Sequence, residues 1–222
     1  MSNGKNGPPE KSGRDVAHSV AKAGLSAIPV VGGAAAELFQ NIVQPPLERR
    51  RAEWMAGLGE RLQQLEEAGL DLEDLKENDE FISAAMYASQ LALRTHSEEK
   101  REALRNALTN IAVGQAPEEA MQHVFLNLVD TLTELHVRIL RLFQGPTPPQ
   151  NMSMGGLSSV LEHNMPEMRG RRDLYDQLWK DLYLRGLVNT DGLHTMMTGQ
   201  GLAQKRTTGL GDAFLQFISE PT

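Results

Sequence analysis

The side chains best suited to chemistry in this chain are its six histidines, which are scattered along the sequence. Glu119 and His123 are four residues apart, a spacing that puts two side chains one helical turn apart on one face. A metal site needs more ligands in register with such a pair, so we expect no bound metal. His136 lies beside an apolar helical stripe, which indicates a hydrogen-bonded histidine in a helix.

Nucleophile and phosphate motifs are missing from the sequence. No serine lies in a G-x-S-x-G elbow, and no glycine-rich phosphate loop precedes a lysine. The run Gly199-Gln200-Gly201 lacks the third glycine and the strand–helix context of a nucleotide site. The absence of cysteine excludes disulfides and thiolate zinc sites and is compatible with a reducing compartment. We therefore expect no catalytic residues, no cofactor and no enzyme activity.

The most unusual segment is a stretch of fourteen uncharged residues, Ala23–Ala36, between Lys22 and Glu37. It is shorter than the roughly 20 apolar residues of a membrane-spanning helix, but its Gly and Ala spacing is typical of helices that approach closely in lipid. Each glycine destabilises a helix interior by roughly 0.5–1 kcal/mol, which makes the segment a weakly held element. The candidate membrane or self-association residues are Gly24, Leu25, Ile28, Pro29, Val30, Val31, Gly32 and Gly33.

This segment has three interpretations. It is a tightly packed helix pair inside a helical core, it leaves that core and inserts into a membrane, or it makes a contact between copies. Arg49, Arg50 and Arg51 follow closely and are either a solvated helix start or contacts for anionic lipid headgroups. The expected partners are membrane lipid or a second copy, bound through residues 15–43.

Charge is unevenly distributed over the 222 residues, whose net charge is −7. Residues 1–46 carry four Lys/Arg and three Asp/Glu, residues 47–144 carry eleven and eighteen, and residues 145–222 carry seven and eight. No part is basic enough for a strong phosphate-binding footprint, so nucleic acid is not an expected partner. The apolar run over 23–36 begins too far from the N-terminus for an export signal. We expect a cytoplasmic protein, peripheral at the inner membrane if the segment is membrane-active.

Helices must position these candidates. Residues 1–14 are expected to form a disordered polar tail, and helical arms are predicted over 16–28 and 34–43, on either side of Pro29. Further helices are predicted from Pro45-Pro46 to Gly69 and over 71–76, 80–94 and 98–113. Thr95 and Glu98 have the spacing of a capping box. The inward residues predicted for the helix over 80–94 are Phe81, Ile82, Ala85, Met86, Ser89, Ala92 and Leu93.

The longest helix is predicted from Pro117 to residue 144, because apolar residues recur there at alternating steps of four and three. They are Met121, Phe125, Leu128, Leu132, Leu135, Ile139 and Leu142. Such a stripe is typical of a core helix in an antiparallel bundle. Residues 15–144 are therefore predicted to form a helical bundle with a Gly/Ala-rich N-terminal helical hairpin, and residues 145–150 a Pro-rich linker.

Residues 151–222 are predicted to form a small winged-helix-like α+β domain. Together with the helical bundle, this makes the predicted fold class mainly α. A helix carrying Leu178 and Leu182 ends at Gly186, and Leu187-Val188 is a short strand. Turn signals predict a hairpin between 193–197 and 202–206, and Thr207 or Thr208 caps a last helix. This domain is a candidate surface for a protein partner.

The end of the chain resembles a known family. Leu182-x3-Gly186-Leu187-Val188, followed by Thr208-x2-Gly211-x2-Phe214-Leu215, is similar to the winged element that ends bacterial abortive-infection proteins of the alpha type. The small-residue helix that leads a helical bundle also looks like the HeLo-like and Bell cell-death domains, which permeabilise membranes. These resemblances imply phage defence and membrane-targeted cell death.

We therefore predict a bacterial anti-phage or abortive-infection effector whose segment 23–36 acts on a membrane after release from the bundle. The alternative is a soluble, non-enzymatic interaction or scaffold protein in which residues 15–43 are permanent core. A third class is a transcriptional regulator that reads DNA through the wing, with Arg171 and Arg172 as contacts.

Overall fold

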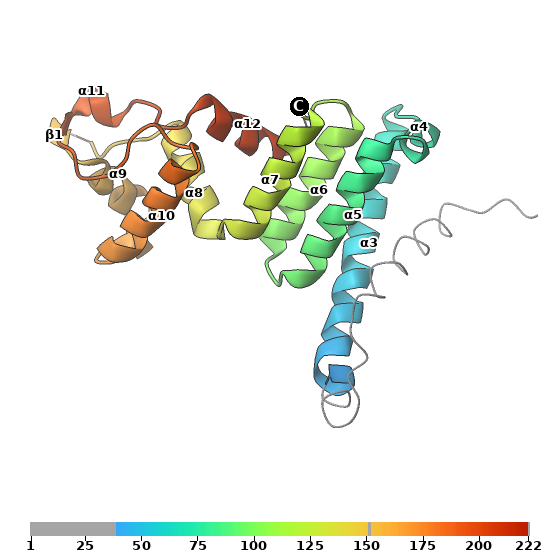
Figure 1. Cartoon of the computed structure of the whole chain (residues 1–222). Helices are drawn as coiled ribbons and strands as arrows, with labels where there is room; N and C mark the ends of the chain where they lie inside the picture. The colour runs from blue at the N-terminus through green and yellow to red at the C-terminus, as the bar shows by residue number, and fades with distance from the viewer. Residues whose placement is uncertain (1–38, 151, 222) are drawn as a thin grey trace, which may run out of the picture.

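The computed structural model describes residues 39–150 and 152–221, which form helices joined by loops and one small two-stranded sheet (Figure 1). This confirms the prediction of a mainly α protein. The predicted tail over 1–14, the helix over 16–28 and the Gly/Ala-rich stretch lie outside the described residues.

Four helices, over residues 44–67, 79–94, 98–112 and 119–131, lie side by side, and each runs in the direction opposite to the one before it (Figure 1). Pro45 and Pro46 occupy the first turn of α3, where the backbone N–H has no helical partner. Asn78 caps α5 by accepting a hydrogen bond from Phe81 N at 3.0 Å. Gly69 follows α3 with φ +103°, a conformation that glycine adopts without strain. The elements of this part are η1 (Phe39–Val43), α3 (Gln44–Glu67), α4 (Leu72–Lys76), α5 (Asp79–Arg94), α6 (Glu98–Ala112) and α7 (Glu119–Thr131).

The inward residues predicted for α5 were right in part, and the cap predicted for α6 was wrong. Phe81 and Ala92 are buried as predicted, but Met86 is 40% exposed, and Ala84 and Ala88 lie on the buried face, where small side chains let neighbouring helices come close. Ser97, and not Thr95, caps α6, since its Oγ accepts a hydrogen bond from Lys100 N at 3.1 Å. The buried residues of α5 are Phe81, Ala84, Ala88, Leu91 and Ala92.

The single long helix predicted from Pro117 to residue 144 is in fact two helices, α7 and α8 (Glu134–Gln144). The backbone is extended at Leu132 and Thr133, with ψ of 142° and 164°. His136 Nδ1 accepts a hydrogen bond from Thr133 N at 3.0 Å, and this local polar contact replaces a helical one. The apolar stripe continues through the elbow, which is why its periodicity did not reveal the break.

The C-terminal elements are β1 (Met154–Gly155), α9 (Leu157–Asn164), η2 (Pro166–Met168), α10 (Arg172–Leu184), β2 (Met197–Thr198), α11 (Gly199–Leu202) and α12 (Gly209–Phe217). Gly186, at φ +72°, follows α10, and Thr208 caps α12. Within residues 152–221 the hairpin predicted between 193–197 and 202–206 is not formed. Residues 199–202 are helical, and β2 pairs with β1 in antiparallel register. An isolated bridge joins Val188 to Thr207, close to the predicted short strand.

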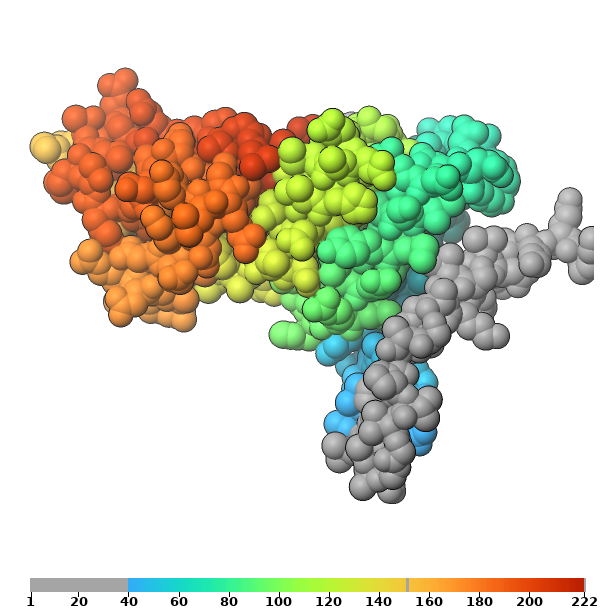
Figure 2. Space-filling model, viewed as in Figure 1, coloured from blue at the N-terminus to red at the C-terminus, as the bar shows by residue number. Residues whose placement is uncertain are grey.

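Helix α12 connects the two parts of the chain. Phe125 of α7 packs against Phe214 and Phe217, with ring centroids 5.6 and 5.5 Å apart. Helix α8 in turn contacts α9, α10 and α12, and Pro146 of the predicted linker is buried. The C-terminal elements and α7 form one continuous surface in Figure 2. The division of the chain into two folding units, residues 15–144 and 151–222, stays a prediction.

Candidate functional site

The predicted membrane-contact residues divide between two regions of the chain. Those from Gly24 to Gly33 lie outside the described residues. Arg49, Arg50 and Arg51 lie in the first half of α3, as expected for a helix that begins at Pro45-Pro46. The side chain of Arg49 is 73% exposed and lies 3.7 Å from a carboxylate oxygen of Glu53. Arg50 and Arg51 are partly exposed, and neither forms an ion pair with another described residue.

The first half of α3 projects from the neighbouring helices (Figure 1). None of its residues before Trp54 is buried, whereas Trp54 is 1% exposed and its indole donates a hydrogen bond to Ser89 Oγ at 3.0 Å. Immediately before α3, Ile42 and Val43 are 60% and 43% exposed. The projecting end thus combines exposed apolar side chains with unpaired arginines.

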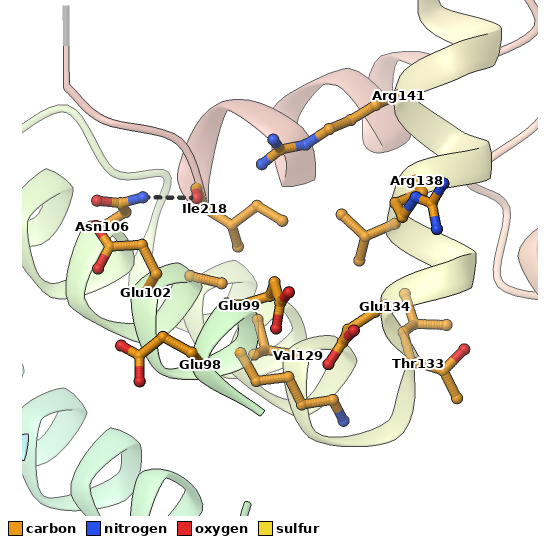
Figure 3. A pocket seen from close by; sticks show the side chains of 14 residues that line it. Glu98, Glu99, Glu102, Asn106, Val129, Thr133, Glu134, Arg138, Arg141 and Ile218 are labelled. Atoms are coloured by element: carbon orange, nitrogen blue, oxygen red, sulfur yellow. Dashed lines mark hydrogen bonds between the residues drawn. The ribbon is translucent and has the colours of Figure 1, made fainter. Parts of the chain in front are cut away.

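A groove of about 710 Å³ opens between α6 and α8 at the elbow where α7 ends (Figure 3). Apolar side chains of Ala103, Val129, Leu132 and Val137 line it, and Ile218, just after α12, closes one end. The groove exists because α8 turns away from the axis of α7 to pack on α9, α10 and α12. A straight helix from 117 to 144 would not have produced it, so the sequence analysis missed this site.

The two walls of the groove carry opposite charges. Helix α6 presents Glu98, Glu99 and Glu102, while α8 presents Arg138 and Arg141 (Figure 3). Glu134, at the start of α8, and Lys100 complete the polar lining. Lys100 Nζ donates a hydrogen bond to Asp130 O at 2.7 Å, and burial lowers the pKa of this amine.

Not all of these charges are available to a ligand. Arg138 is paired with Glu167. Glu98 and Glu102 are held by arginines behind the wall. Within the described residues, Glu99, Glu134 and Arg141 take part in no ion pair. Among the described residues the groove therefore offers two carboxylates and one guanidinium outside any ion pair, around an apolar floor, and Ser97 Oγ donates a hydrogen bond to Glu99 at 3.3 Å.

An arginine network supports the acidic wall from the side of α3. Arg101 and Arg105 are each 11% exposed, and both form ion pairs with Glu98. Hydrogen bonds from Arg101 and then Arg105 lower the pKa of Glu98. Burial opposes ionisation of Glu102, but hydrogen bonds from Arg105 and Arg61 outweigh it and lower the pKa of that carboxyl. Both acids are thereby held ionised.

His136 is the least well satisfied polar side chain near the groove. Its side chain is 7% exposed, and its Nε2 has no hydrogen-bond partner in the described residues, although Asp181 Oδ2 lies 3.5 Å away. Burial lowers the pKa of the imidazole and outweighs the attraction of Asp181. The prediction of a hydrogen-bonded histidine in a helix is confirmed, through Nδ1.

The described residues offer no group of three or more His, Cys, Asp or Glu side chains that could hold a metal. His123 Nε2 and Glu119 Oε1 lie 4.0 Å apart on the surface. Among the helices of the described ranges, none is both long and apolar enough to cross a membrane.

The chain was compared with protein families, curated proteins and solved structures, and it matches none of them. Two features of the described residues offer a surface to a partner: the projecting start of α3 and the groove between α6 and α8.

Proposed function

We propose that this chain is a non-enzymatic helical effector that acts on a membrane through its uncharged segment 23–36. The observation that carries the proposal is the projecting end of the described structure, where Ile42 and Val43 are exposed and Arg50 and Arg51 are unpaired. An apolar segment followed by free cations matches the two layers of an anionic bilayer, hydrocarbon and headgroup.

The mechanism has a resting and an inserted state. At rest, the segment is sheltered against the helical part of the chain. After release, burying Leu25, Ile28, Val30 and Val31 in lipid contributes roughly 1.5–3 kcal/mol each at full burial. Because neither arm alone crosses a layer about 30 Å thick, copies assemble through Gly24, Gly32 and Gly33, whose small size lets helices approach closely.

The biological setting of this proposal is bacterial anti-phage defence of the abortive-infection type, in a cytoplasmic protein that reaches the inner membrane peripherally. The finer fold assignment belongs to the same proposal: residues 15–144 are an antiparallel bundle, and residues 151–222 are a winged-helix-like domain that contacts a protein partner. Support comes from the resemblance of the segments around Gly186 and Gly211 to the family's winged element.

A soluble interaction protein is the second candidate, and the groove between α6 and α8 favours it. In that case residues 15–43 are permanent core. The substitution Val30→Asp separates the two: a core position predicts unfolding, whereas a lipid-contacting position predicts a folded chain that no longer acts on membranes. Salt-dependent DNA binding that is lost on changing Arg171 and Arg172 to Ala would instead favour the regulator class.

Sedimentation with anionic vesicles tests the headgroup contact. Each cation near an anionic surface contributes about 1 kcal/mol, so the double change Arg50→Gln and Arg51→Gln should weaken vesicle binding roughly tenfold or more. Arg171→Gln with Arg172→Gln makes the same change of charge in the C-terminal part and serves as the matched control. Equal weakening by both pairs would reduce the effect to net charge and remove the proposed contact.

A further inference from the structure

The elbow between α7 and α8 is held by an unusual capping box. In an ordinary capping box, a Ser or Thr before the helix is paired with a Glu or Gln three residues later, whose side chain accepts a hydrogen bond from the backbone N–H of the first residue. At the start of α8 these two positions are occupied by Thr133 and His136. His136 Nδ1 accepts the hydrogen bond from Thr133 N at 3.0 Å, so an imidazole replaces the usual carboxylate or amide.

This hydrogen bond determines where the imidazole carries its proton. Because a backbone N–H can only donate, Nδ1 must be the unprotonated nitrogen, and the proton of the neutral ring lies on Nε2. A second proton therefore enters at Nδ1, where it displaces the bond to Thr133 N. Thr133 Oγ1, 2.8 Å away, can accept that proton, but Thr133 N then loses its acceptor.

The capping box holds the backbone where the chain turns from α7 into α8 (Figure 1). Thr133 is extended, with ψ of 164°. The first N–H groups of a helix have no carbonyl partner within it, so loss of the cap destabilises the first turn of α8. The rest of α8 stays anchored, since Ile139, Leu140 and Phe143 are fully buried. Loosening is thereby confined to the elbow, where Thr133 and Glu134 line the groove (Figure 3).

The charges around the imidazole decide how readily it takes the second proton. Asp181 of α10 favours the protonated ring, because its Oδ2 lies 3.5 Å from Nε2. Arg185 of α10 and Lys100 of α6 oppose protonation. The charged side chains of α9, α12 and α8 itself are exposed or hydrogen-bonded elsewhere; they are Glu162, His163, Asp212, Glu134, Arg138 and Arg141.

We propose that the Thr133–His136 capping box is an acid-sensitive latch, closed while the imidazole is neutral and opened when Nδ1 takes a proton. Opening frees the first turn of α8 and reshapes the elbow end of the groove between α6 and α8. Burial lowers the pKa of His136 below its ordinary 6.5, so the latch is closed at neutral pH and opens only as the pH falls below 6.5. The latch operates whether or not the chain acts on a membrane.

Amide hydrogen exchange of the full chain, followed residue by residue by NMR, tests the latch. After correction for the intrinsic effect of pH on exchange, protection of the Thr133 amide should fall about tenfold from about pH 7.5 to about pH 5. Protection of the Phe143 amide, in the anchored part of α8, should change less than about twofold over the same range. The imidazole nitrogen shifts of the same sample show which ring nitrogen carries the proton.

Three variants separate the latch from a merely structural role. His136→Gln keeps an ordinary capping-box acceptor that does not titrate, so the Thr133 amide should stay protected at both pH values. His123→Gln, at an exposed histidine of α7, should keep the response of the unsubstituted chain. Asp181→Asn removes the charge that favours the protonated ring, so the change at Thr133 should move to lower pH.

Three results would overturn the latch: a Thr133 amide whose protection does not change with pH, an equal change in His136→Gln, or ring nitrogen shifts that place the proton of the neutral ring on Nδ1. Circular dichroism at both pH values establishes that each variant is folded. The first and third results come from the unsubstituted chain alone, so a variant that fails to fold still leaves the latch open to refutation.

Discussion

At the residue scale, stability depends on polar side chains that satisfy backbone groups far away in the sequence. Asn110 of α6 donates hydrogen bonds through Nδ2 to Phe217 O at 2.9 Å and to Ser219 O at 2.8 Å. Asn106, one turn earlier, donates to Ile218 O at 3.1 Å. The last carbonyls of a helix have no partner within that helix. The two asparagines of α6 therefore cap the C-terminal end of α12.

Replacing Asn110 by alanine should therefore lower the free energy of unfolding by about 2 kcal/mol, because buried carbonyls lose their donor. Urea denaturation of the full chain measures this loss. Asn127→Ala on the exposed face of α7 is the matched control, with an expected change within about 0.5 kcal/mol. Equal changes in the two variants would show that Asn110 does not cap α12.

His136 predicts a pH dependence of stability. Burial keeps its pKa in the folded chain below the ordinary 6.5, so the unfolded chain binds the proton more readily. The free energy of unfolding should then fall as the pH drops below 6.5. The carboxylates Glu98 and Glu102 add to this loss only below their ordinary pKa of 4.5, because their folded pKa values are lowered.

The variant His136→Gln should flatten the stability profile between pH 6.5 and about 5, while His123→Gln on the surface should keep its slope. Urea midpoints at several pH values provide the measurement. An unchanged slope in His136→Gln would assign the pH dependence to other groups.

At the element scale, α12 is docked by close backbone contact. A Cβ added at Gly211 would lie 2.3 Å from Leu187 O, whereas one added at Gly209 meets nothing within 4 Å. Thr208 Oγ1 donates a hydrogen bond to Gly186 O at 2.6 Å and accepts one from Gly211 N at 3.0 Å. Glycine at 211 thus lets the first turn of α12 rest on the chain that leaves α10.

The change Gly211→Ala should accordingly lower the melting temperature strongly, at a cost of about 2–3 kcal/mol, because the backbone must move to admit the methyl group. Gly209→Ala, two residues earlier in the same turn, should be neutral or slightly stabilising, since it restricts the unfolded chain. Calorimetry of both variants measures the difference. Similar melting temperatures would mean that the Leu187 contact yields easily.

The success of sequence-based prediction also varied by element. Local chemistry identified the start of α3 at Pro45-Pro46 and the end of α10 at Gly186, and it limited the cap of α12 to Thr207 or Thr208, of which the structure uses Thr208. Each of these signals depends on residues next to one another. The break at Thr133 was missed, since a heptad-like stripe continues through it. The pairing of β1 with β2 was missed as well, because it joins segments far apart in the chain.

Of the two candidate sites, the sequence predicted the arginines of α3 but not the groove. The sequence placed Arg49, Arg50 and Arg51 correctly on a helix. The groove between α6 and α8 follows from the elbow at Thr133 and from tertiary packing of α8, neither of which has a periodic signal. The acidic row Glu98, Glu99 and Glu102 was visible in the sequence, but its partner wall on α8 was not.

At the scale of the whole molecule, the projecting start of α3 differs in charge from the acidic helical part that follows it. Residues 47–144 carry eleven Lys/Arg and eighteen Asp/Glu, so the helical part is repelled by an anionic bilayer. In the proposed function, the projecting start of α3 would keep that acidic part away from the headgroups while the preceding segment reaches the lipid. Ile42 and Val43, immediately before α3, are also apolar and exposed.

Dye release from anionic vesicles tests this account most directly. We measure it for the full chain. The account predicts release by this chain, loss of release on adding Gly24→Leu with Gly32→Leu, and loss on adding Val30→Asp, with every variant still folded. Failure of the full chain to release dye, or release that survives Val30→Asp, would contradict the account.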